Sequence, residues 1–439
     1  MTAAPATTAL RVRTQPIRLT GPLLDVLPAD SGVLSWVRGG EGIVGWGEVA
    51  RFTGTGPDRF ADADRWWQEL RAGLDVRDDV GLPGTGAVAF ASFTFADDSP
   101  GSVLVVPRVV VGRRGSRAWM TEIVPAGGPE PAPSALPAAS PVRPGGRLRY
   151  SDGRVSPSRY RTVVAEAARR MRAGELGKAV LAHDVVAHAE TPLDPRFLLH
   201  GLSRGYPTCW SYAVDGLVGA TPELLLRLRD GLVESRVLAG TIWPGERRRP
   251  NPDGAAPDGP DPNGPAPADD SAYDLGGALF GSGKDRREHA YAVDSLAASL
   301  RPLLRELEVP SAPRVLTLPN VSHLASDVRG HLDPGRPVSL LGLLGAVHPT
   351  AAVGGTPTDT ATALISEIEG MDRGRYAGPV GYLDAHGGGE LGIALRCAEL
   401  DGPTARLFAG CGIVADSDPD VEVREAAAKM RAVREALQS

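Results

Sequence analysis

Three charged residues near the end of the chain have the spacing of a metal site on one helical face. Glu422, Glu425 and Lys429 stand at positions i, i+3 and i+7 of a run that Asp418 can cap and Pro419 can open. Carboxylate oxygens near the positive end of a helix dipole suit a hard cation such as magnesium. The alternative is a solvated helix with a Glu425–Lys429 ion pair. A separate apolar stripe is expected from Val423, Ala427, Met430 and Val433, which leaves the polar face no core to fill.

A lysine and a glutamate at strand ends are of the types needed for acid–base catalysis. Lys178 begins an apolar run that ends at His183, and burial among apolar side chains disfavours the charged ammonium. It then becomes a base near neutral pH, unless it is a surface lysine whose stem alone lies on apolar neighbours. Glu223 follows Pro222 and directly precedes an apolar strand that starts at Leu224. This position suits a general acid whose pKa is raised by burial.

Further polar residues lie at a helix start, in turns or in an apolar strand. Glu288 opens a helix and can join Glu425 as a second oxygen ligand, or it stabilises the helix dipole alone. Arg396 lies within an apolar strand, where a buried guanidinium needs a substrate carboxylate or a structural aspartate as its partner. His348 and Tyr376 lie at turns that can line the same pocket. The eight histidines form no HExxH or similar pattern, so no zinc site is expected.

The composition limits the class of protein and of ligand. The chain has 439 residues, 42% of them hydrophobic, and a net charge of −6. This charge argues against a nucleic-acid partner or an acidic membrane, so an anionic ligand needs local cations, backbone amides or a metal. Three cysteines without CxxC spacing indicate buried free thiols in a reducing compartment. The start of the chain does not have the pattern of a signal peptide, and no apolar run approaches the roughly 20 residues of a membrane span, which predicts a soluble, cytoplasmic protein.

The catalytic candidates fall in the second of two regions. Residues 1–124 mix strand-like runs with one helix over 58–74, and 125–157 is a Pro/Ala/Gly-rich linker. The region 158–439 contains every candidate named above. Its expected elements are a helix over 159–172, a strand over 178–183, a mobile polar insertion over about 244–270, a helix over 287–304 and a glycine turn over 409–414.

The motifs of the second region occur in a fixed order. They are Gly177–Ala182, Ala220–Leu225, Leu238–Thr241, Lys284–His289, Val347–Thr350, Leu395–Ala398 and Ala409–Val414, followed by Glu422–Glu425. Across 158–437 this series resembles the chorismate-utilising enzymes, the family of anthranilate, aminodeoxychorismate, isochorismate and salicylate synthases. The resemblance implies an α/β (α+β) fold with two large antiparallel sheets stacked face to face and helices outside. It also implies that segment 1–124 contributes to the same composite fold.

Three positions indicate the branch of this family. Lys178 is similar to the isochorismate and salicylate synthases, where a lysine activates water, whereas the ammonia-using anthranilate synthases typically lack it. Ala239 stands where the aminodeoxychorismate branch carries a lysine nucleophile. The turn His348-Pro349-Thr350 is similar to the isochorismate synthases. The resemblance therefore implies a magnesium-dependent isomerase, an isochorismate synthase, with no glutaminase subunit.

Other interpretations stay open beside this one. Salicylate synthase uses the same residues and then eliminates pyruvate. A protein that kept the fold and only binds carboxylates has no need of both base and acid, which argues against it. The overall texture resembles actinobacterial enzymes of menaquinone biosynthesis, and a siderophore or salicylate pathway is the alternative.

The resemblance also implies a role for each residue. Glu288 and Glu425 hold Mg²⁺, with Asp285 and Glu422 in support. Lys178 takes a proton from the water that attacks ring carbon 2, and Glu223 protonates the hydroxyl that leaves carbon 4. Arg396 and Tyr376 grip the enolpyruvyl carboxylate, and backbone amides of 410–413 form an anion nest for the ring carboxylate. The full set expected to bind substrate is Gly240, Thr241, His348, Tyr376, Arg396, Gly410, Cys411, Gly412 and Lys429.

Overall fold

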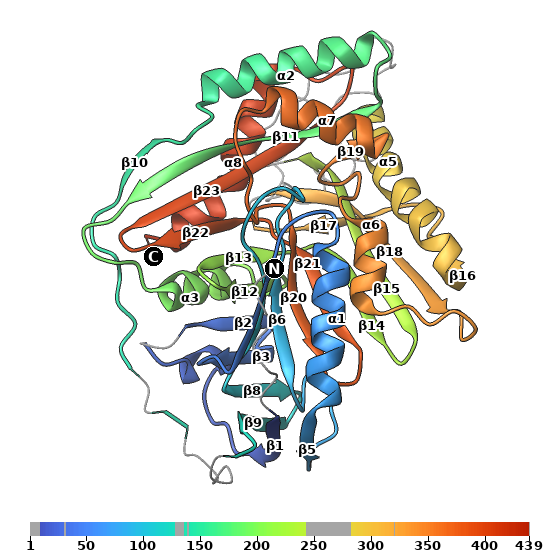
Figure 1. Cartoon of the computed structure of the whole chain (residues 1–439). Coiled ribbons are helices and arrows are strands. Elements are labelled where there is room, and N and C mark those ends of the chain that lie inside the picture. Colours follow the sequence, from blue (N-terminus) through green and yellow to red (C-terminus); the bar gives the residue numbers. More distant parts are fainter. Residues whose placement is uncertain are drawn as a thin grey trace, which may run out of the picture.

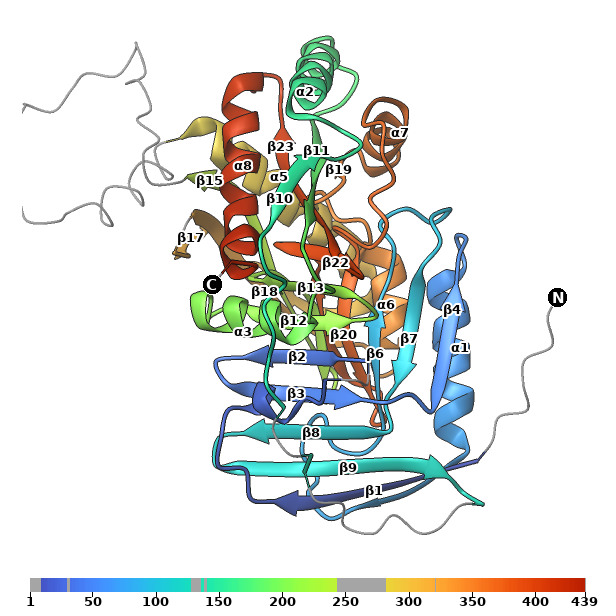
Figure 2. The same ribbon diagram turned by 90° about the vertical axis from the view of Figure 1, so that its left-hand side faces the viewer.

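The computed structural model describes residues 9–29, 32–127, 136–137, 140–242, 282–319 and 321–438. Within these ranges the strands form one sheet of thirteen strands and one of ten. Figure 1 shows helices α2 (Pro157–Arg172) and α8 (Pro419–Ala436) over one end of the larger sheet, and Figure 2 shows the same arrangement from the side. The expected fold of two large sheets with helices outside is confirmed.

The larger sheet alternates between early and late parts of the chain. All its strand pairs are antiparallel except β1 with β5. In spatial order it contains β10 (Arg149–Asp152), β11 (Lys178–His188), β23 (Thr404–Ile413), β22 (Cys397–Asp401), β13 (Leu217–Thr221), β12 (Trp210–Val214), β2 (Leu34–Arg38), β3 (Glu41–Trp46), β8 (Val109–Arg114), β9 (Arg117–Pro125), β1 (Leu10–Ile17) and β5 (Leu74–Asp78), with β19 (Gly355–Thr356) on β11.

The smaller sheet is antiparallel and also joins both parts of the chain, through the pairing of β20 (Pro379–Asp384) with β6 (Val88–Ser92). In spatial order it contains β16 (Leu304–Glu308), β18 (Ser322–Leu332), β15 (Leu232–Ile242), β14 (Leu224–Arg229), β21 (Gly389–Ile393), β20 (Pro379–Asp384), β6 (Val88–Ser92), β7 (Ser102–Val106) and β4 (Ala50–Gly54), with β17 (Arg314–Thr317) on β18. Strands from before residue 125 therefore complete both sheets.

Helices cover the outer side of each sheet. α2 packs on β11 and β23, and α8 packs on β23 and α2. α3 (Pro195–Gly205) packs on α8, and α5 (Gly283–Leu300) packs on β15 and β18. Side-chain caps fix several helix starts: the carboxylate of Asp418 accepts the amides of Asp420 and Val421 at the first turn of α8, as expected. The remaining helices are α1 (Arg59–Ala72), α6 (Leu340–Val347), α7 (Thr358–Ile368) and the short 3₁₀ turns η1 (Leu23–Val26) and η2 (Arg301–Leu303).

Some expected boundaries differ from the observed ones. The helix expected over 287–304 begins earlier, because the Ser282 hydroxyl accepts the Asp285 amide and caps it, and it ends at Leu300. The insertion expected over 244–270 lies outside the described residues, as do 128–135 and 138–139 of the expected linker. Among the helices that are described, none is long and apolar enough to cross a membrane.

The two sheets meet at a buried hydrogen bond within the main core. The indole Nε1 of Trp36 on β2 donates to the Oε2 of Glu390 on β21 at 3.0 Å. Glu390 is 5% exposed, and its other oxygen lies 3.1 Å from the Nε of Arg227. Because one partner lies on each sheet, this bond links the two sheets directly.

We expect Trp36→Phe to lower the free energy of unfolding by about 1.5–3 kcal/mol more than Trp67→Phe, because the first change removes a hydrogen bond to a carboxylate. Trp67 is a matched control, since it is 3% exposed and its Nε1 has no hydrogen-bond partner among the described residues. Urea denaturation of both variants measures the difference. Equal losses would show that the bond between the sheets contributes nothing to stability.

Candidate active site

A small cavity lies where ends of β11, β15, β18 and β23 approach one another. Its volume is about 50 Å³, which is room for a few water molecules rather than for a substituted ring. A ligand as large as a substituted ring must therefore displace side chains when it enters. The predicted site residues that line the cavity are Glu223, Thr241, Glu288, Tyr376, Arg396, Gly410, Gly412 and Lys429.

Lys178 lies behind this cavity rather than in its lining. It begins β11, as expected, and its side chain is fully buried, which excludes the surface-lysine alternative. Its Nζ lies 3.4 Å from the Oε1 of Glu288, which does line the cavity. Burial lowers the pKa of Lys178 below its ordinary value of 10.5, while Glu288 and Glu223 act in the opposite direction. The Lys178 ammonium therefore releases its proton more readily than a solvated lysine.

Glu223 lies in the turn that joins β13 to β14, with only 4% of its surface exposed. Burial raises the pKa of its carboxyl to about 8, and the weak bond from the Leu238 amide to Oε1, at 3.4 Å, opposes this only in part. Glu223 is therefore protonated at neutral pH and can donate. The site thus combines a buried acid that keeps its proton with a buried lysine that tends to lose its own.

The segment expected as a glycine turn is a strand, so that prediction is wrong. Gly410, Cys411 and Gly412 belong to β23 and pair with β11 from Ala182 to Val180. The glycines serve close approach, because a Cβ on Gly410 would lie 2.5 Å from the Leu181 oxygen and one on Gly412 would overlap the Glu288 carboxylate. An anion nest needs successive amides turned to one side, which a strand does not provide. The amides of 410–413 therefore do not converge as a nest requires, and a contact of single amides with the ring carboxylate stays a prediction.

Arg396 lies in the turn between β21 and β22, not within a strand as expected, and has a φ of +47°. Its Nη2 donates to Nε2 of His323 at 3.1 Å. A guanidinium only donates, so Nε2 accepts and Nδ1 carries the proton, which it gives to the Thr241 hydroxyl at 3.1 Å. Burial, followed by the charge of Arg396, lowers the pKa of His323 well below its usual value. Among the described residues the Nε of Arg396 has no hydrogen-bond partner, which leaves a donor for an anionic ligand.

His323 also lines the cavity and is the residue that sequence reasoning missed. It lies in β18 opposite Thr241 of β15. The available signal was one histidine within the apolar run Val321–Ala325. A polar ring buried in such a run is expected to have a hydrogen-bond partner, but the sequence does not reveal which residue that partner is.

The C-terminal helix buries its charged face, contrary to expectation. Glu422 is fully buried, whereas Ala427, expected in the apolar stripe, is exposed. Lys429 donates from Nζ to the Gly410 oxygen at 3.0 Å and pairs with the Oε1 of Glu425 at 2.6 Å. These internal partners are the reason that charged residues can face inward.

Buried carboxylates lie close to both lysines of the site. Glu422 and Glu425 form, with Cys411, a group of buried metal-ligand atoms within 4.8 Å of one another, and Glu288 is not in that group. Glu288 contacts Lys178 and lines the cavity, Glu425 contacts Lys429, and Asp285 is also buried. The donors are mainly hard oxygens, so the set fits a divalent cation.

Besides Lys178 and the acidic residues Asp285, Glu422 and Glu425, three residues expected to bind substrate do not line the cavity. His348 lines a separate, larger cavity, where its ring contacts Phe60 and Phe95 and its Nε2 lies 3.0 Å from the Phe95 oxygen. Cys411 points toward the last helix, with its Sγ 3.4 Å from the Glu422 oxygen. Gly240, at a φ of +72°, lies against Asp285, whose Cβ would be 2.8 Å from a Cβ added there. Gly240 therefore holds β15 close to α5 and so positions Thr241.

We expect Gly410→Ala to destabilise the protein by about 1–3 kcal/mol, because the new methyl group meets backbone of β11 that cannot move freely. Gly205→Ala is the control, since no atom lies within 4 Å of the position of its added Cβ. Thermal and urea unfolding measure both. An unchanged stability of Gly410→Ala would mean that β11 and β23 are less closely packed than described.

Comparison with known proteins identifies the family. The model of the chorismate binding enzymes matches residues 31–435. The salicylate biosynthesis isochorismate synthase of Pseudomonas aeruginosa is 33% identical over 433 residues, which cover 92% of this chain and 84% of that protein. Isochorismate synthase DhbC of Bacillus subtilis is 36% identical over 295 residues, covering 64% and 68%. The structure of MenF, the menaquinone-specific isochorismate synthase of Escherichia coli, matches with a TM-score of 0.75 and 25% identity, covering 99% of this chain and 96% of its own. This chain is a member of the chorismate binding enzyme family.

Proposed function

We propose that this protein is an isochorismate synthase, an isomerase that converts chorismate to isochorismate. The observation that carries the proposal is the pair of buried groups, Lys178 and Glu223, whose pKa values are shifted in opposite directions beside one cavity. Such a pair suits a reaction that needs a base and an acid at neutral pH. Both curated relatives described above carry the name isochorismate synthase.

Substrate orientation depends on the cationic groups of the cavity. Among the residues that the structure describes, the Nε of Arg396 has no hydrogen-bond partner, and its Nη2 is held by His323, so the guanidinium can bind the enolpyruvyl carboxylate in a fixed direction. Tyr376 lines the same wall and stacks on Phe408 with ring centroids 5.1 Å apart. Lys429 lies at the β23 side, where the ring carboxylate would be placed. Two carboxylates held at two points fix the ring.

The chemical step exchanges one hydroxyl for another. Lys178 removes a proton from a water molecule, whose oxygen forms a bond to ring carbon 2. The ring double bonds shift, the bond between carbon 4 and its hydroxyl breaks, and Glu223 gives that hydroxyl its proton so that it leaves as water. The numbers of atoms and charges balance, because one water enters and one leaves. Lys178 must reach the ring past Glu288, so the pair between them opens when substrate binds.

We propose Mg²⁺ as the metal, held by Glu288 and Glu425 with Asp285 and Glu422 in support. The grouping of buried carboxylate oxygens from Glu422 and Glu425 supports this assignment, and Gly412 leaves the space in which the Glu288 carboxylate lies. When bound, the ion neutralises the ring carboxylate of the substrate. The protein residues orient the substrate and carry out both proton transfers.

We propose menaquinone biosynthesis as the pathway of the product, which is supported by the match to the menaquinone-specific structure over almost the full length of both chains. A 2,3-dihydroxybenzoate-specific isochorismate synthase of Bacillus anthracis matches to a similar extent, so a siderophore pathway is an alternative. The relative named for salicylate biosynthesis supports a salicylate pathway, and a salicylate synthase would release pyruvate as well. We also propose that the protein acts in the cytoplasm. No glutaminase subunit is expected, since water rather than ammonia is the nucleophile.

The proposal is tested by incubating the purified protein with chorismate, with and without Mg²⁺, and separating the products by chromatography. Isochorismate that forms only with the metal is the expected result. Salicylate and pyruvate would move the protein to the salicylate synthases. Unchanged chorismate, under conditions where a known isochorismate synthase works, would contradict the proposed activity.

Lys178→Ala and Glu223→Gln are each expected to lower kcat by about 10²–10⁴-fold, the usual contribution of a general base or acid. Both should still bind chorismate, because neither residue anchors a carboxylate. Steady-state kinetics and calorimetric binding measure the two effects. Wild-type kcat in either variant would contradict its role.

The value of kcat/KM should decrease at alkaline pH, with the midpoint of the decrease near pH 8. Glu223 must carry its proton to act as an acid, and that proton is lost as the pH rises through a pKa of about 8. On the acid side the rate should rise with pH as Lys178 loses its proton. A profile at saturating Mg²⁺ that stays level from pH 7 to about 9.5 would contradict the assignment of Glu223 as the acid.

Mg²⁺ should raise the melting temperature of the wild type, because a ligand that binds only the folded state increases the free energy of unfolding. The increase is about 2.7 kcal/mol at a ligand concentration of 100 times Kd. Glu425→Gln should abolish this rise. Glu435→Gln, which changes an exposed residue of the same helix, should keep it. A rise of equal size in both variants would exclude Glu425 as a ligand.

A further inference from the structure

The strand that carries Lys178 has a gap on one of its edges. β11 pairs along one edge with β23, from Ala179 to His188. On its other edge β19 pairs only with Lys178 and Ala179, and β10 pairs only from Val185 to His188. Among the described residues, no strand pairs with the stretch between these two short neighbours. The backbone groups there need other partners, because the stretch is buried.

An ion pair at the end of α7 fills this gap. Glu369 accepts the Ala182 amide at 2.9 Å, and Arg373 donates from Nη2 to the Val180 oxygen at 2.6 Å. The two side chains bind each other in a bidentate manner at 2.7 and 2.6 Å. They are only 1% and 2% exposed. One acceptor and one donor thus take the place of a neighbouring strand.

The same arginine also binds the loop that faces the strand. Arg373 Nη1 donates to the Val353 oxygen at 3.0 Å, and the Val180 amide donates to the Gly354 oxygen at 2.7 Å. Val180 and Val353 both line the small cavity. The fork of Arg373 therefore sets the distance between two parts of the cavity wall, and it does so two residues along β11 from Lys178.

We propose that Glu369 and Arg373 are positioning residues for the reaction, which hold Lys178 and the Val353 loop in place by substituting for the missing strand. This inference rests on the proposed function for its kinetic consequence. Neither residue lines the small cavity, so they act through β11 and the loop. A planar guanidinium suits the role because its fork can reach a carboxylate and two carbonyl groups at once.

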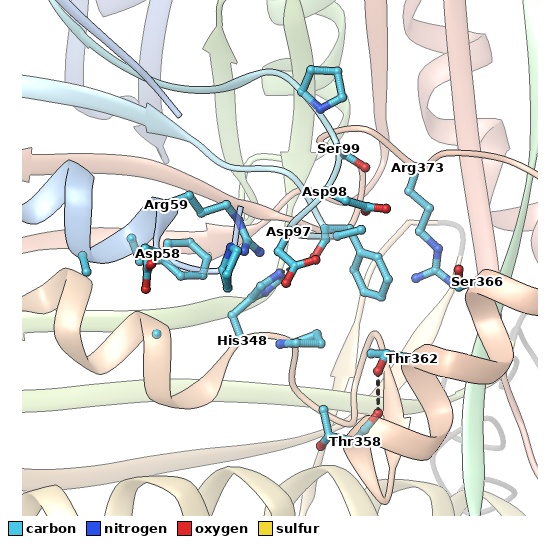
Figure 3. A pocket seen from close by; sticks show the side chains of 18 of the residues that line it. Asp58, Arg59, Asp97, Asp98, Ser99, His348, Thr358, Thr362, Ser366 and Arg373 are labelled. Atoms are coloured by element: carbon cyan, nitrogen blue, oxygen red, sulfur yellow. Dashed lines mark hydrogen bonds between the residues drawn. The ribbon is translucent and has the colours of Figure 1, made fainter. Parts of the chain in front are cut away.

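The ion pair is accessible from a second cavity. Glu369 and Arg373 line a cavity of about 1270 Å³, together with residues of α1, α6 and α7. Figure 3 shows Arg373 at the side of this cavity, with Ser366 near it and His348 across from it. A small cation can therefore reach the place of the Arg373 side chain from this cavity. This access makes chemical rescue possible.

The test is the variant Arg373→Ala, assayed with and without millimolar methylguanidinium. We expect kcat to fall about 10- to 100-fold, since a misplacement of about 1 Å can cost 10²-fold in rate. Methylguanidinium should restore most of the loss in a saturable way, and methylammonium, which lacks the planar fork, should not. A kcat equal to that of the wild type, or a loss that methylguanidinium leaves unchanged, would overturn the proposal.

Arg196→Ala is the matched control for lost stability. Arg196 is also 2% exposed, pairs with Asp194 at 2.6 Å and donates to backbone carbonyls, but it lies in α3 and lines neither cavity. Below its melting temperature it should keep the wild-type kcat and show no effect of methylguanidinium. If Arg373→Ala does not fold, Arg373→Lys replaces it, with a lowered kcat expected and an unchanged kcat as the contradicting result.

Amide hydrogen exchange separates this inference from the proposed function. Exchange over 178–184 should be faster in Arg373→Ala than in Arg196→Ala and should slow again with methylguanidinium. This readout needs no substrate. A wild-type protein inactive on chorismate would overturn the function, whereas unchanged exchange over 178–184 would overturn the positioning role.

Discussion

Exclusion of water from Lys178 and Glu223 is the constraint on which the rest of the structure depends. Burial favours the neutral form of each side chain, so it lowers the pKa of the lysine and raises that of the glutamic acid. In water the same two residues would be an ammonium and a carboxylate at neutral pH, so the lysine could not accept a proton and the glutamate could not donate one. The stacked sheets keep this part of the molecule dry.

Lysine is suited to this role where arginine is not. The chain has only three lysines, Lys178, Lys284 and Lys429, among 47 basic residues. Lys178 and Lys429 are both buried at the site. An arginine keeps its proton under all conditions met in proteins, whereas a buried lysine can release it. In the proposed mechanism, Arg396 therefore supplies a permanent positive charge, whereas Lys178 can lose and regain a proton.

Partners within the protein make this concentration of buried charge possible. Glu288 pairs with Lys178, Glu425 with Lys429, and Arg396 with His323. The volume of the cavity is small because these side chains contact one another. A dianionic substrate and a divalent cation would exchange these internal contacts for their own, with little change in net charge.

Features that depend on local sequence could be predicted, and those that depend on distant contacts could not. Lys178 and Glu223 stand at strand boundaries that turn residues mark, so the sequence predicts their positions and a buried Glu223, whereas for Lys178 it leaves a buried and a surface lysine as alternatives. The inward face of α8 was not, because its charged residues find partners on β23, far away in sequence. Likewise, glycines such as those in 410–412 occur both in turns and in strands that pack closely against a neighbour, so the sequence alone does not distinguish a turn from the strand beside β11. The partnership of His323 with Arg396 needs two strands and a turn that only the folded chain brings together.

The most direct test of the account is the titration of Lys178 itself. A protein labelled with ¹³C at the lysine ε-carbons contains three such groups, and Lys178→Ala identifies one of them by its loss. In the metal-free protein, NMR should show that Lys178 titrates at a pH clearly below its ordinary pKa of 10.5. A Lys178 that stays protonated up to or beyond that pH would contradict the claim that burial prepares it as the base.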